Sequence, residues 1–260
     1  MNIKKISADF IVKHKVRFSD LYSLLILTPA DLSPLPEILP GQFVQVEIAD
    51  SKTTYLRRPF SVNFVDYEHN ELWLLVRAAG DGTRHLTAAV EGAIINIVLP
   101  LGRGFTMPQS PESRILLIGG GVGVAPLLYF GARLAEAGIR PEFLLGARSA
   151  SDLLETEYFE QYGKLNISTE DGTAGEKGLV TVNSALDRPF DMIACCGPMP
   201  MMKAVAKIAR DKGIDCEVSL ENMMACGLGA CLCCVEKNSE GHNVCVCTDG
   251  PVFNINQLSW

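Results

Sequence analysis

The N-terminal part of the chain consists of short stretches in which polar and apolar residues alternate. Residues 42–48 show this alternation, and residues 72–76 form a second run of residues that favour strands. A period of two is typical of strands that bury one face, and turn residues separate the stretches. We therefore expect an antiparallel β barrel or sandwich over residues 1–107.

A short segment after this region breaks the pattern. Residues 107–112 contain two prolines and few apolar residues, a composition that ends helices and strands. We place the first domain boundary in this segment.

Apolar strands then recur at intervals of about 25 residues, and helical stretches separate them. The helical stretches 125–137 and 199–212 are followed by Gly138 and Gly213, and glycine suits the left-handed position that closes a helix. This alternation predicts a five-stranded parallel α/β domain over residues 112–215. The expected strands are residues 115–118, 142–145, 165–168, 191–195 and 216–220.

The last segment, residues 216–260, has little hydrophobic periodicity and many cysteines and glycines. Apolar packing alone would stabilise such a segment poorly, whereas a bound metal centre adds its binding free energy to folding. We therefore expect a small module organised around a metal.

Charge and hydropathy exclude several classes of protein. The chain of 260 residues has 23 basic and 30 acidic residues, and its net charge of −7 argues against binding to nucleic acid or to an anionic membrane. The most apolar run, residues 115–130, contains four glycines and a proline and is shorter than the roughly 20 residues that cross a bilayer. The first residues lack the continuous apolar stretch of a secretion signal, so we expect a cytoplasmic protein.

Six of the nine cysteines fall in the stretch from Cys226 to Cys247. In a chain without an export signal, such clustering favours metal ligation over disulfides. Cys226, Cys231 and Cys234 have the spacing C-x4-C-x2-C, and a further cysteine follows at a distance. This is the spacing of plant-type [2Fe–2S] proteins.

The loop between the first two cysteines also suits a cluster. Gly227 and Gly229 permit positive φ angles and a close approach of the backbone. Zinc is the rival metal, but structural zinc sites usually have two paired arms of closely spaced cysteines. The pattern therefore favours a [2Fe–2S] cluster.

The remaining cysteines have different expected roles. Cys245 and Cys247 are both available as the fourth ligand, and spacing alone does not separate them. Cys233 lies between two ligands and is expected to point away from the cluster. Cys195 and Cys216 lie at the ends of expected strands, where a free cysteine behaves as a small buried apolar residue.

A glycine-rich turn follows the first strand of the α/β region. Gly119, Gly120, Gly121 and Gly123 lead directly into a helix, and Pro126 suits the first turn of that helix. Backbone N–H groups in such a turn, together with the helix N-terminus, can bind a pyrophosphate. We interpret the turn as part of a pyridine-nucleotide site.

The second strand of this region does not identify the nucleotide. It ends with Gly146, Ala147 and Arg148, without the acidic residue that reads the ribose in a standard dinucleotide-binding fold. Arg148 either meets a 2′-phosphate or lies in solvent. The residues therefore leave NAD and NADP open.

Two motifs in the β region are candidates for a second nucleotide. Residues 57–61, Arg-Arg-Pro-Phe-Ser, bring cationic, aromatic and hydroxyl groups to a strand edge. Residues 77–83 contain Gly-Asp-Gly before a helix that we expect to start near Thr83, which is a second candidate phosphate site. Each motif is ordinary alone, but their order ahead of a nucleotide-binding region strengthens the interpretation.

These motifs resemble the ferredoxin–NADP reductase superfamily. Its flavin motif R-x-[YF]-S matches Arg58–Ser61, its G-x-G-x-x-P turn matches residues 121–126, and its late C-G-P motif matches residues 196–198. Residues 224–231, MACGLGAC, and residues 247–253, CTDGPVF, closely resemble one family within it, the electron transfer subunits of class B dihydroorotate dehydrogenases. The resemblance covers essentially the whole chain.

The resemblance implies FAD, NAD rather than NADP, and one [2Fe–2S] cluster. The implied FAD-binding residues are Arg58, Pro59, Phe60, Ser61, Leu75, Val76, Arg77, Gly82 and Thr83. The implied pyridine-nucleotide residues are Gly119, Gly120, Gly121, Gly123, Pro126, Cys196, Gly197 and Pro198. The implied cluster ligands are Cys226, Cys231, Cys234 and Cys247.

The resemblance also implies a function. NADH exchanges two electrons as a hydride and a [2Fe–2S] cluster exchanges one, so a flavin, which can do both, is needed between them. The chain is then expected to pass electrons from a catalytic, FMN-containing subunit that oxidises dihydroorotate, through the cluster and FAD, to NAD+, in pyrimidine biosynthesis. We expect a heterotetramer with two copies of each subunit, and an apolar surface around Met223, Met224 and Leu228 would suit the contact. The four histidines lie far apart in the chain and indicate no separate acid–base site.

Two alternatives stay open. The small subunit of a ferredoxin-dependent NADP reductase or of a sulfide dehydrogenase shares these modules. A cluster-bearing regulatory or assembly protein would bind the nucleotide without turnover.

Overall fold

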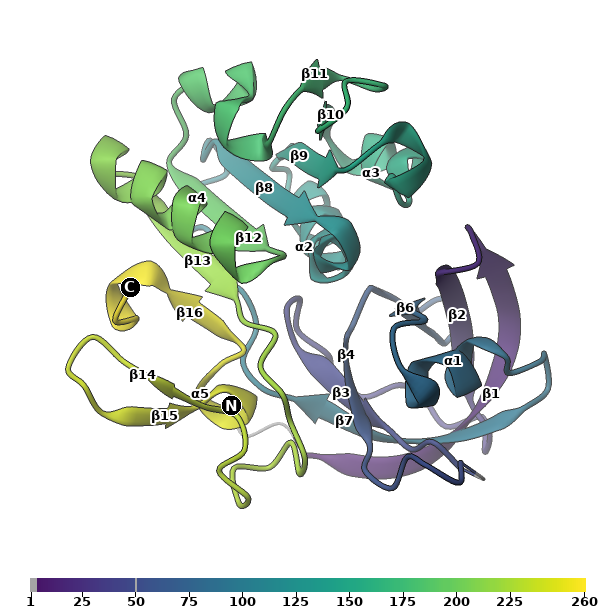
Figure 1. Cartoon of the computed structure of the whole chain (residues 1–260). Coiled ribbons are helices and arrows are strands. Elements are labelled where there is room, and N and C mark those ends of the chain that lie inside the picture. The colour runs from purple at the N-terminus through teal and green to yellow at the C-terminus, as the bar shows by residue number, and fades with distance from the viewer. Residues whose placement is uncertain (1–3, 50) are drawn as a thin grey trace.

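The structure is a computed structural model, and it describes residues 4–49 and 51–260. Over these residues the chain forms two large sheets and a small C-terminal module (Figure 1). The N-terminal sheet lies below the second sheet in this view, and the module contacts both.

The N-terminal sheet is antiparallel and curls into a barrel. Its strand order is β4-β3-β7-β1-β2-β6-β5. Side chains at alternate strand positions fill the interior, among them Leu25, Val44 and Leu74. This confirms the antiparallel β region that the alternating pattern predicts. The strands are β1 Ile6–Arg17, β2 Tyr22–Pro29, β3 Phe43–Val46, β4 Arg58–Ser61, β5 Phe64–Asp66, β6 Glu71–Arg77 and β7 Ile94–Leu101.

The second sheet has the order β11-β10-β9-β8-β12-β13-β16, and its strands are parallel except for β16, which runs antiparallel to β13. All five expected strands are present. The sheet is wider than predicted, because it also contains β11 and β16. The sequence pattern does not reveal them, since β11 has only two residues and β16 lies in the segment without hydrophobic periodicity. The strands are β8 Ile115–Gly120, β9 Glu142–Ala147, β10 Lys164–Thr169, β11 Glu176–Lys177, β12 Met192–Cys196, β13 Asp215–Ser219 and β16 Val252–Asn254.

Helices cover both faces of this sheet. Leu116 and Ile118 of β8 pack in the layer that contains α4, whereas Ile115 and Leu117 pack in the layer that contains α2 and α3. A strand buried on both faces is apolar at successive positions, as this one is. The helices are α2 Ala125–Glu136, α3 Thr156–Tyr162 and α4 Met199–Lys212.

Two helix ends follow the prediction from glycine. After α2 the backbone turns at Gly138, with φ +81°, and α4 is capped by Gly213, with φ +65°. The short helix α1, Asp81–Thr87, begins two residues before the predicted start at Thr83. No helix within residues 4–49 and 51–260 is long and apolar enough to cross a membrane.

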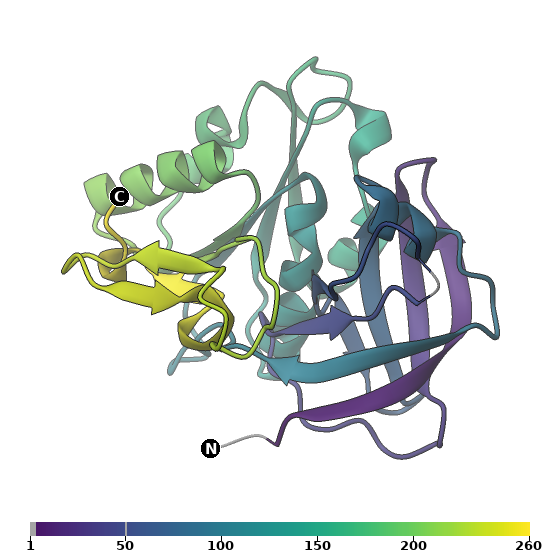
Figure 2. The ribbon, with the colours of Figure 1, turned by 60° about the horizontal axis from the view of Figure 1, so that its bottom comes forward.

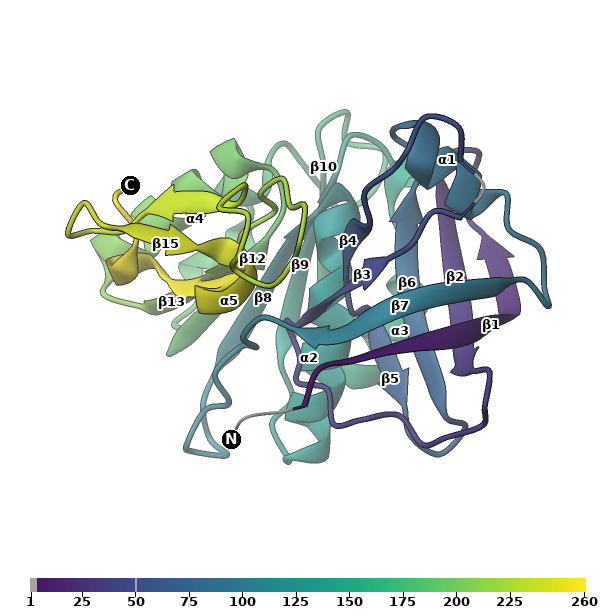
Figure 3. The ribbon, with the colours of Figure 1, turned by 90° about the horizontal axis from the view of Figure 1, so that it is seen from below.

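The C-terminal module consists of a long loop, a short hairpin and a return to the second sheet. The loop follows β13, and the module lies beside the barrel and below α4 in Figure 2. Figure 3 shows its loop next to the barrel strands. Its elements before β16 are β14 Val235–Lys237, β15 Asn243–Cys245 and α5 Val246–Asp249.

A buried polar contact joins the barrel to the second sheet. Glu155 precedes α3 in a left-handed conformation, with φ +58°, and its carboxylate accepts a hydrogen bond from Asn63 Nδ2 at 3.0 Å. The same amide donates to the carbonyl of Ala125 at 3.2 Å. Burial raises the pKa of Glu155 to about 7. Rings from both sides pack around this boundary, with Trp73 against Tyr158 at 5.5 Å between centroids.

Candidate functional site

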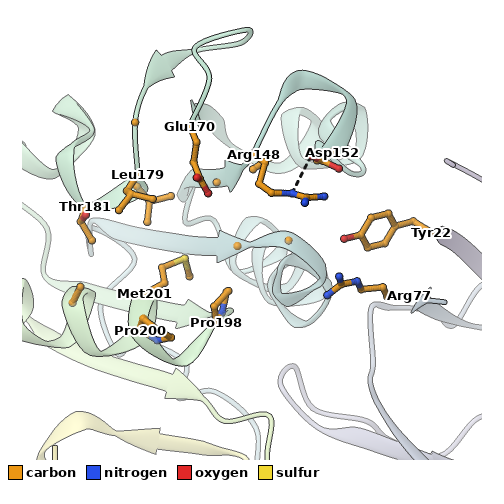
Figure 4. Close-up of a pocket in the computed structure, with 17 residues that line it drawn as sticks. Tyr22, Arg77, Arg148, Asp152, Glu170, Leu179, Thr181, Pro198, Pro200 and Met201 are labelled. Carbon is orange, nitrogen blue, oxygen red and sulfur yellow. Dashed lines mark ion pairs between the residues drawn. The ribbon is translucent and has the colours of Figure 1, made fainter. Parts of the chain in front are cut away.

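A cavity of about 500 Å³ lies at the carboxyl ends of β8 and β9 (Figure 4). Gly120 and Gly121 form part of its wall, and Pro198 and Met201 line it from the start of α4. Ligands of open α/β sheets bind at this edge, where successive loops leave the sheet in opposite directions. The cavity therefore matches the expected pyridine-nucleotide site in position.

The glycine turn contains residues with two different roles. Gly121 has φ +57° and lines the cavity together with Gly120. A Cβ atom on Gly123 would lie 2.6 Å from the backbone of Gly197, and one on Gly119 would lie 2.8 Å from the side chain of Val124. Gly119 and Gly123 thus permit tight packing of the turn, and Gly121 faces the ligand space. Gly120 does both, because a Cβ atom there would lie 2.6 Å from Met201 Sδ.

Neighbouring parallel strands bring the other expected residues to the same edge. Because β12 lies next to β8, the loop at Cys196 and Gly197 packs directly on the glycine turn. Pro126 is buried in the first turn of α2. The expected residues of this site are therefore brought together by the fold.

One carboxyl group at this edge was not predicted. Glu221 Oε1 lies 3.8 Å from Cys196 Sγ, and the surrounding protein raises the pKa of the Glu221 carboxyl by desolvation, although the side chain is open to a cavity. Burial also raises the pKa of the Cys196 thiol. Glu221 comes just after β13, and that position at the carboxyl edge of a parallel sheet is the signal that sequence reasoning missed.

The polar wall of the first cavity carries two more acidic residues that the sequence reasoning missed. Arg148 Nε lies 3.5 Å from Asp152 Oδ2 in a surface ion pair, and the Arg148 side chain is still 72% exposed. Glu170 directly follows β10 and lines the same cavity. Figure 4 shows these side chains on one side and Tyr22 and Arg77 on the barrel side.

A second cavity, of about 210 Å³, lies between the barrel and the second sheet. Most residues of the expected flavin site line it. Val76 is an exception, because its side chain is fully buried in the barrel core and only its backbone can face a ligand. The lining residues from the expected set are Pro59, Phe60, Ser61, Leu75 and Arg77.

The two adjacent arginines of the flavin motif have different surroundings. Arg57 donates to Asn96 Oδ1 at 2.6 Å and lies 3.4 Å from Glu47, so it holds strands of the barrel together. Arg58 donates only to nearby backbone carbonyls among the described residues, and its Nε would lie 3.5 Å from a Cβ atom on Gly82. Arg58 and the start of α1 are thus brought together, as the expected phosphate site requires.

The turn before α1 is held by a side chain. The Thr83 hydroxyl oxygen accepts hydrogen bonds from the backbone N–H groups of Ala79 and Gly80, both at 2.9 Å. Gly82 is buried, and a Cβ atom there would lie 2.9 Å from the Thr54 side chain. Thr83 therefore shapes this turn, and its own oxygen is already engaged by the backbone.

The cysteine loop directs backbone N–H groups at sulfur atoms. Cys226 Sγ accepts from Leu228 N at 3.3 Å, and Cys247 Sγ accepts from Gly229 N at 3.1 Å. Gly227 and Gly229 have φ angles of +69° and +81°, which confirms the positive values expected from the sequence. The loop folds around sulfur rather than around an apolar core.

The thiols form two pairs. Cys226 contacts Cys231, and Cys247 contacts Cys234. The N–H of Leu228 lowers the pKa of the Cys226 thiol to about 6, whereas burial raises the pKa of Cys247 to about 12. A [2Fe–2S] cluster needs two thiolates on each iron, so two pairs of cysteines fit this group.

The other cysteines lie where the sequence suggests. Cys195 and Cys216 are fully buried in the core of the second sheet, which confirms the packing role expected for them. Cys233 is exposed. The backbone N–H of Cys245 donates to Asp249 at 2.8 Å, and it is the sulfur of Cys247 that reaches the glycine loop.

Comparisons with known proteins bear on this arrangement. The family model described as "Iron-sulfur cluster binding domain of dihydroorotate dehydrogenase B" matches residues 221–259. A protein of Shouchella clausii named "Dihydroorotate dehydrogenase B (NAD(+)), electron transfer subunit" is 40% identical over 84% of this chain and 86% of its own length. A protein of Bacillus velezensis with the same name is also 40% identical, over 85% of this chain and 87% of its own length.

Solved structures are similar over a comparable length. A chain of an NADH-dependent reduced ferredoxin-NADP oxidoreductase matches with a TM-score of 0.85 and 31% identity, over 96% of this chain and 90% of that chain. The flavohemoglobin of Malassezia yamatoensis matches with a TM-score of 0.68 and 22% identity, over 80% of this chain and 57% of that chain. The second similarity concerns the fold alone.

Proposed function

Because the chain belongs to the family of electron transfer subunits of dihydroorotate dehydrogenase B, we propose that it passes electrons between a dihydroorotate-oxidising catalytic subunit and NAD+. The chain is an NAD-linked flavin iron–sulfur oxidoreductase subunit of pyrimidine biosynthesis. When bound, the [2Fe–2S] cluster exchanges single electrons, and FAD exchanges either one or two. The protein positions these groups relative to one another.

One observation carries the proposal, namely that the pyridine-nucleotide site adjoins the flavin site and the flavin site adjoins the cysteine loop. Arg77 lines both the first and the second cavity, so the pyridine-nucleotide site adjoins the flavin site. Leu220, Glu221 and Met224 line the second cavity and lead directly to the ligand Cys226. Electrons therefore cross from one bound group to the next over adjacent residues.

Individual residues take distinct roles in this proposal. The N–H groups at Gly120 and Gly121 bind the pyrophosphate of NAD, and Arg58 pairs with the pyrophosphate of FAD. Phe60 and Ser61 hold the flavin ring edge. Cys226, Cys231, Cys234 and Cys247 ligate the cluster.

The acidic wall of the first cavity supports NAD over NADP. Asp152 lies 3.5 Å from Arg148 Nε and offsets part of the positive charge that would attract a 2′-phosphate. Glu170 adds a second carboxylate to the same wall, and like charges repel a phosphate dianion. These residues favour a free ribose hydroxyl.

The proposed assembly is a heterotetramer with two copies of this chain and two of the FMN-containing catalytic subunit, in the cytoplasm. Met223, Leu228 and Leu232 are exposed around the cysteine loop, which suits contact with that partner. Met224 differs from the expectation, since it is partly buried against the core. We also propose that barrel, nucleotide-binding domain and cluster module correspond to residues 1–107, 112–215 and 216–260.

The test is an assay of the purified holoprotein alone and with the catalytic subunit. The chain alone should oxidise NADH with an artificial acceptor and should not reduce NAD+ with dihydroorotate. Added catalytic subunit should start dihydroorotate-dependent NADH formation. Dihydroorotate turnover by the chain alone would contradict the proposal.

The similarity to the ferredoxin-NADP oxidoreductase chain keeps a second candidate in view, the small subunit of a ferredoxin-dependent NADP reductase. Reduced ferredoxin with NADP+ is therefore the second substrate pair of the assay. Turnover with this pair, and none with dihydroorotate and the catalytic subunit, would favour the second candidate.

A further inference from the structure

Gln45 is a buried side chain whose polar atoms lack partners. It lies in β3 with no exposed surface, and neither its Nε2 nor its Oε1 has a hydrogen-bond partner among residues 4–49 and 51–260. Its neighbours Val44 and Val46 fill the barrel interior. Because successive side chains of a strand point to opposite faces, Gln45 points out of the barrel.

On that outer face Gln45 meets the cysteine loop. A Cβ atom on Gly227 would lie 2.8 Å from Gln45 Cγ and 3.1 Å from Gln45 Nε2. Gly227 directly follows the ligand Cys226. In the sheet, Gln45 pairs with Pro59 of the flavin motif, so this one residue connects the flavin strand to the cluster loop.

An unpartnered amide in this position destabilises the folded chain. A buried polar group without a hydrogen bond loses its contacts with water and gains none in return, whereas an apolar side chain of the same shape has no such contacts to lose. A bound group that supplies an acceptor removes the cost. The loop encloses sulfur atoms, and these already accept hydrogen bonds from backbone N–H groups, among them those of Leu228, Gly229 and Cys247.

We propose that Gln45 is a positioning residue that donates its side-chain N–H to the sulfur shell of the [2Fe–2S] cluster and thereby raises the reduction potential of the cluster. This inference rests on the proposed function, because it requires the cluster. Hydrogen bonds to sulfur stabilise the reduced, more negative state, which is how a protein tunes such a potential. The flavin-binding barrel would then adjust a cluster held by a different part of the chain.

The test is a redox titration of the holoprotein followed by electron paramagnetic resonance, in the parent and in Gln45→Met. Methionine has nearly the same length and volume but no N–H group. The variant should retain its iron and show at least a tenfold shift of the cluster toward the oxidised form, which for one electron is about 59 mV. The potential of the flavin should not change.

Gln42→Met is the matched control. Gln42 is also a buried glutamine near the start of β3, but its Nε2 donates to Gly102 O and its Oε1 accepts from Leu39 N, both at 2.8 Å. The control should lose stability, because two hydrogen bonds disappear, and it should keep the cluster potential of the parent.

Other outcomes overturn the inference. An unchanged cluster potential in an iron-replete Gln45→Met variant would mean that water satisfies the amide, and a shift of the flavin potential alone would assign the amide to FAD. If the variant loses iron, the parent labelled with ¹⁵N in glutamine side chains decides, since pulsed electron paramagnetic resonance should detect that nitrogen at the reduced cluster. No such coupling would refute the contact. A parent chain that binds no cluster at all would instead contradict the proposed function.

Discussion

The nucleotide-binding sheet and the cluster module differ in the kind of residue that they bury. β8 is buried on both faces, with Leu116 and Ile118 in one apolar layer and Ile115 and Leu117 in the other. In the module, by contrast, two of the four proposed ligands, Cys234 and Cys247, are buried beside apolar residues such as Val246 and Phe253. Apolar packing on both faces specifies the first region, whereas we expect the cysteine loop of the second to depend on a few sulfur atoms.

This difference shows in the backbone as well. The sheet has long regular elements that close with glycine caps, whereas the cysteine loop has neither helix nor strand between β13 and β14 among the described residues. Its conformation follows from Gly227, Gly229 and the N–H groups directed at sulfur. We therefore expect the two regions to respond differently to substitution.

The largest expected effect is the loss of a cluster ligand. Serine at Cys226, Cys231, Cys234 or Cys247 should remove the cluster, because the alkoxide of serine is a poor substitute for a thiolate. Module amides, including those that pair β16 with β13, should then exchange rapidly with solvent, while those of β8, β9 and β12 stay protected. Iron and sulfide assays and hydrogen exchange measure both responses.

The remaining cysteines of the segment serve as controls for this experiment. Serine at Cys233 or Cys245 should leave the cluster largely in place. An intact cluster in Cys247→Ser together with a lost one in Cys245→Ser would reassign the fourth ligand. Loss of protection in β8, β9 and β12 would show that the two regions do not fold separately.

A smaller effect is expected at the boundary between the barrel and the nucleotide-binding sheet. Glu155 has a pKa of about 7 in the folded chain, above its ordinary value of 4.5. Between these values the folded state binds more protons than the unfolded state, so stability should fall as pH rises from about 4.5 to 7 and stay low above it. The full loss is about 3 kcal/mol.

Glu155→Gln should remove this slope and make the chain more stable than the parent at pH 8. Urea unfolding between pH 5.5 and 8.5 measures the difference, with Glu157→Gln on the exposed side of α3 as the control. Equal pH dependence in the parent and in Glu155→Gln would contradict the prediction. A change in the iron content of Glu155→Gln would show that the cluster module and the nucleotide-binding sheet do not respond separately to substitution.

The smallest effect is expected in the barrel, where we propose that FAD binds between the two regions. Arg58→Ala should weaken FAD binding by about ten- to a hundredfold, because a charge-assisted hydrogen bond contributes on the order of 1.5–3 kcal/mol. Flavin release on dilution, followed by fluorescence, gives the affinity. Arg57→Ala should destabilise the barrel without this loss, and equal FAD affinity in Arg58→Ala and the parent would remove Arg58 from the phosphate site.

The sequence predicts the parts of the molecule that local rules determine. Periodicity locates the expected strands, Gly138 and Gly213 mark the helix ends, and cysteine spacing identifies the cluster type. It does not predict Glu221, Gln45 or Glu155, because each acquires its role from residues far away in the chain. Asn63, for example, lies 92 positions from the carboxylate it contacts.

Strand β16 connects iron binding in the module to the aggregation of the whole chain. It follows the proposed ligand Cys247 and covers the edge of β13, with Val218 opposite Phe253. We expect a chain that has not received iron to release this strand more often and then to expose a row of unpaired N–H and C=O groups on β13. Such an edge is a template for intermolecular pairing. The supply of iron in the cell should therefore influence how long newly synthesised chains escape aggregation and degradation, in addition to how fast they transfer electrons.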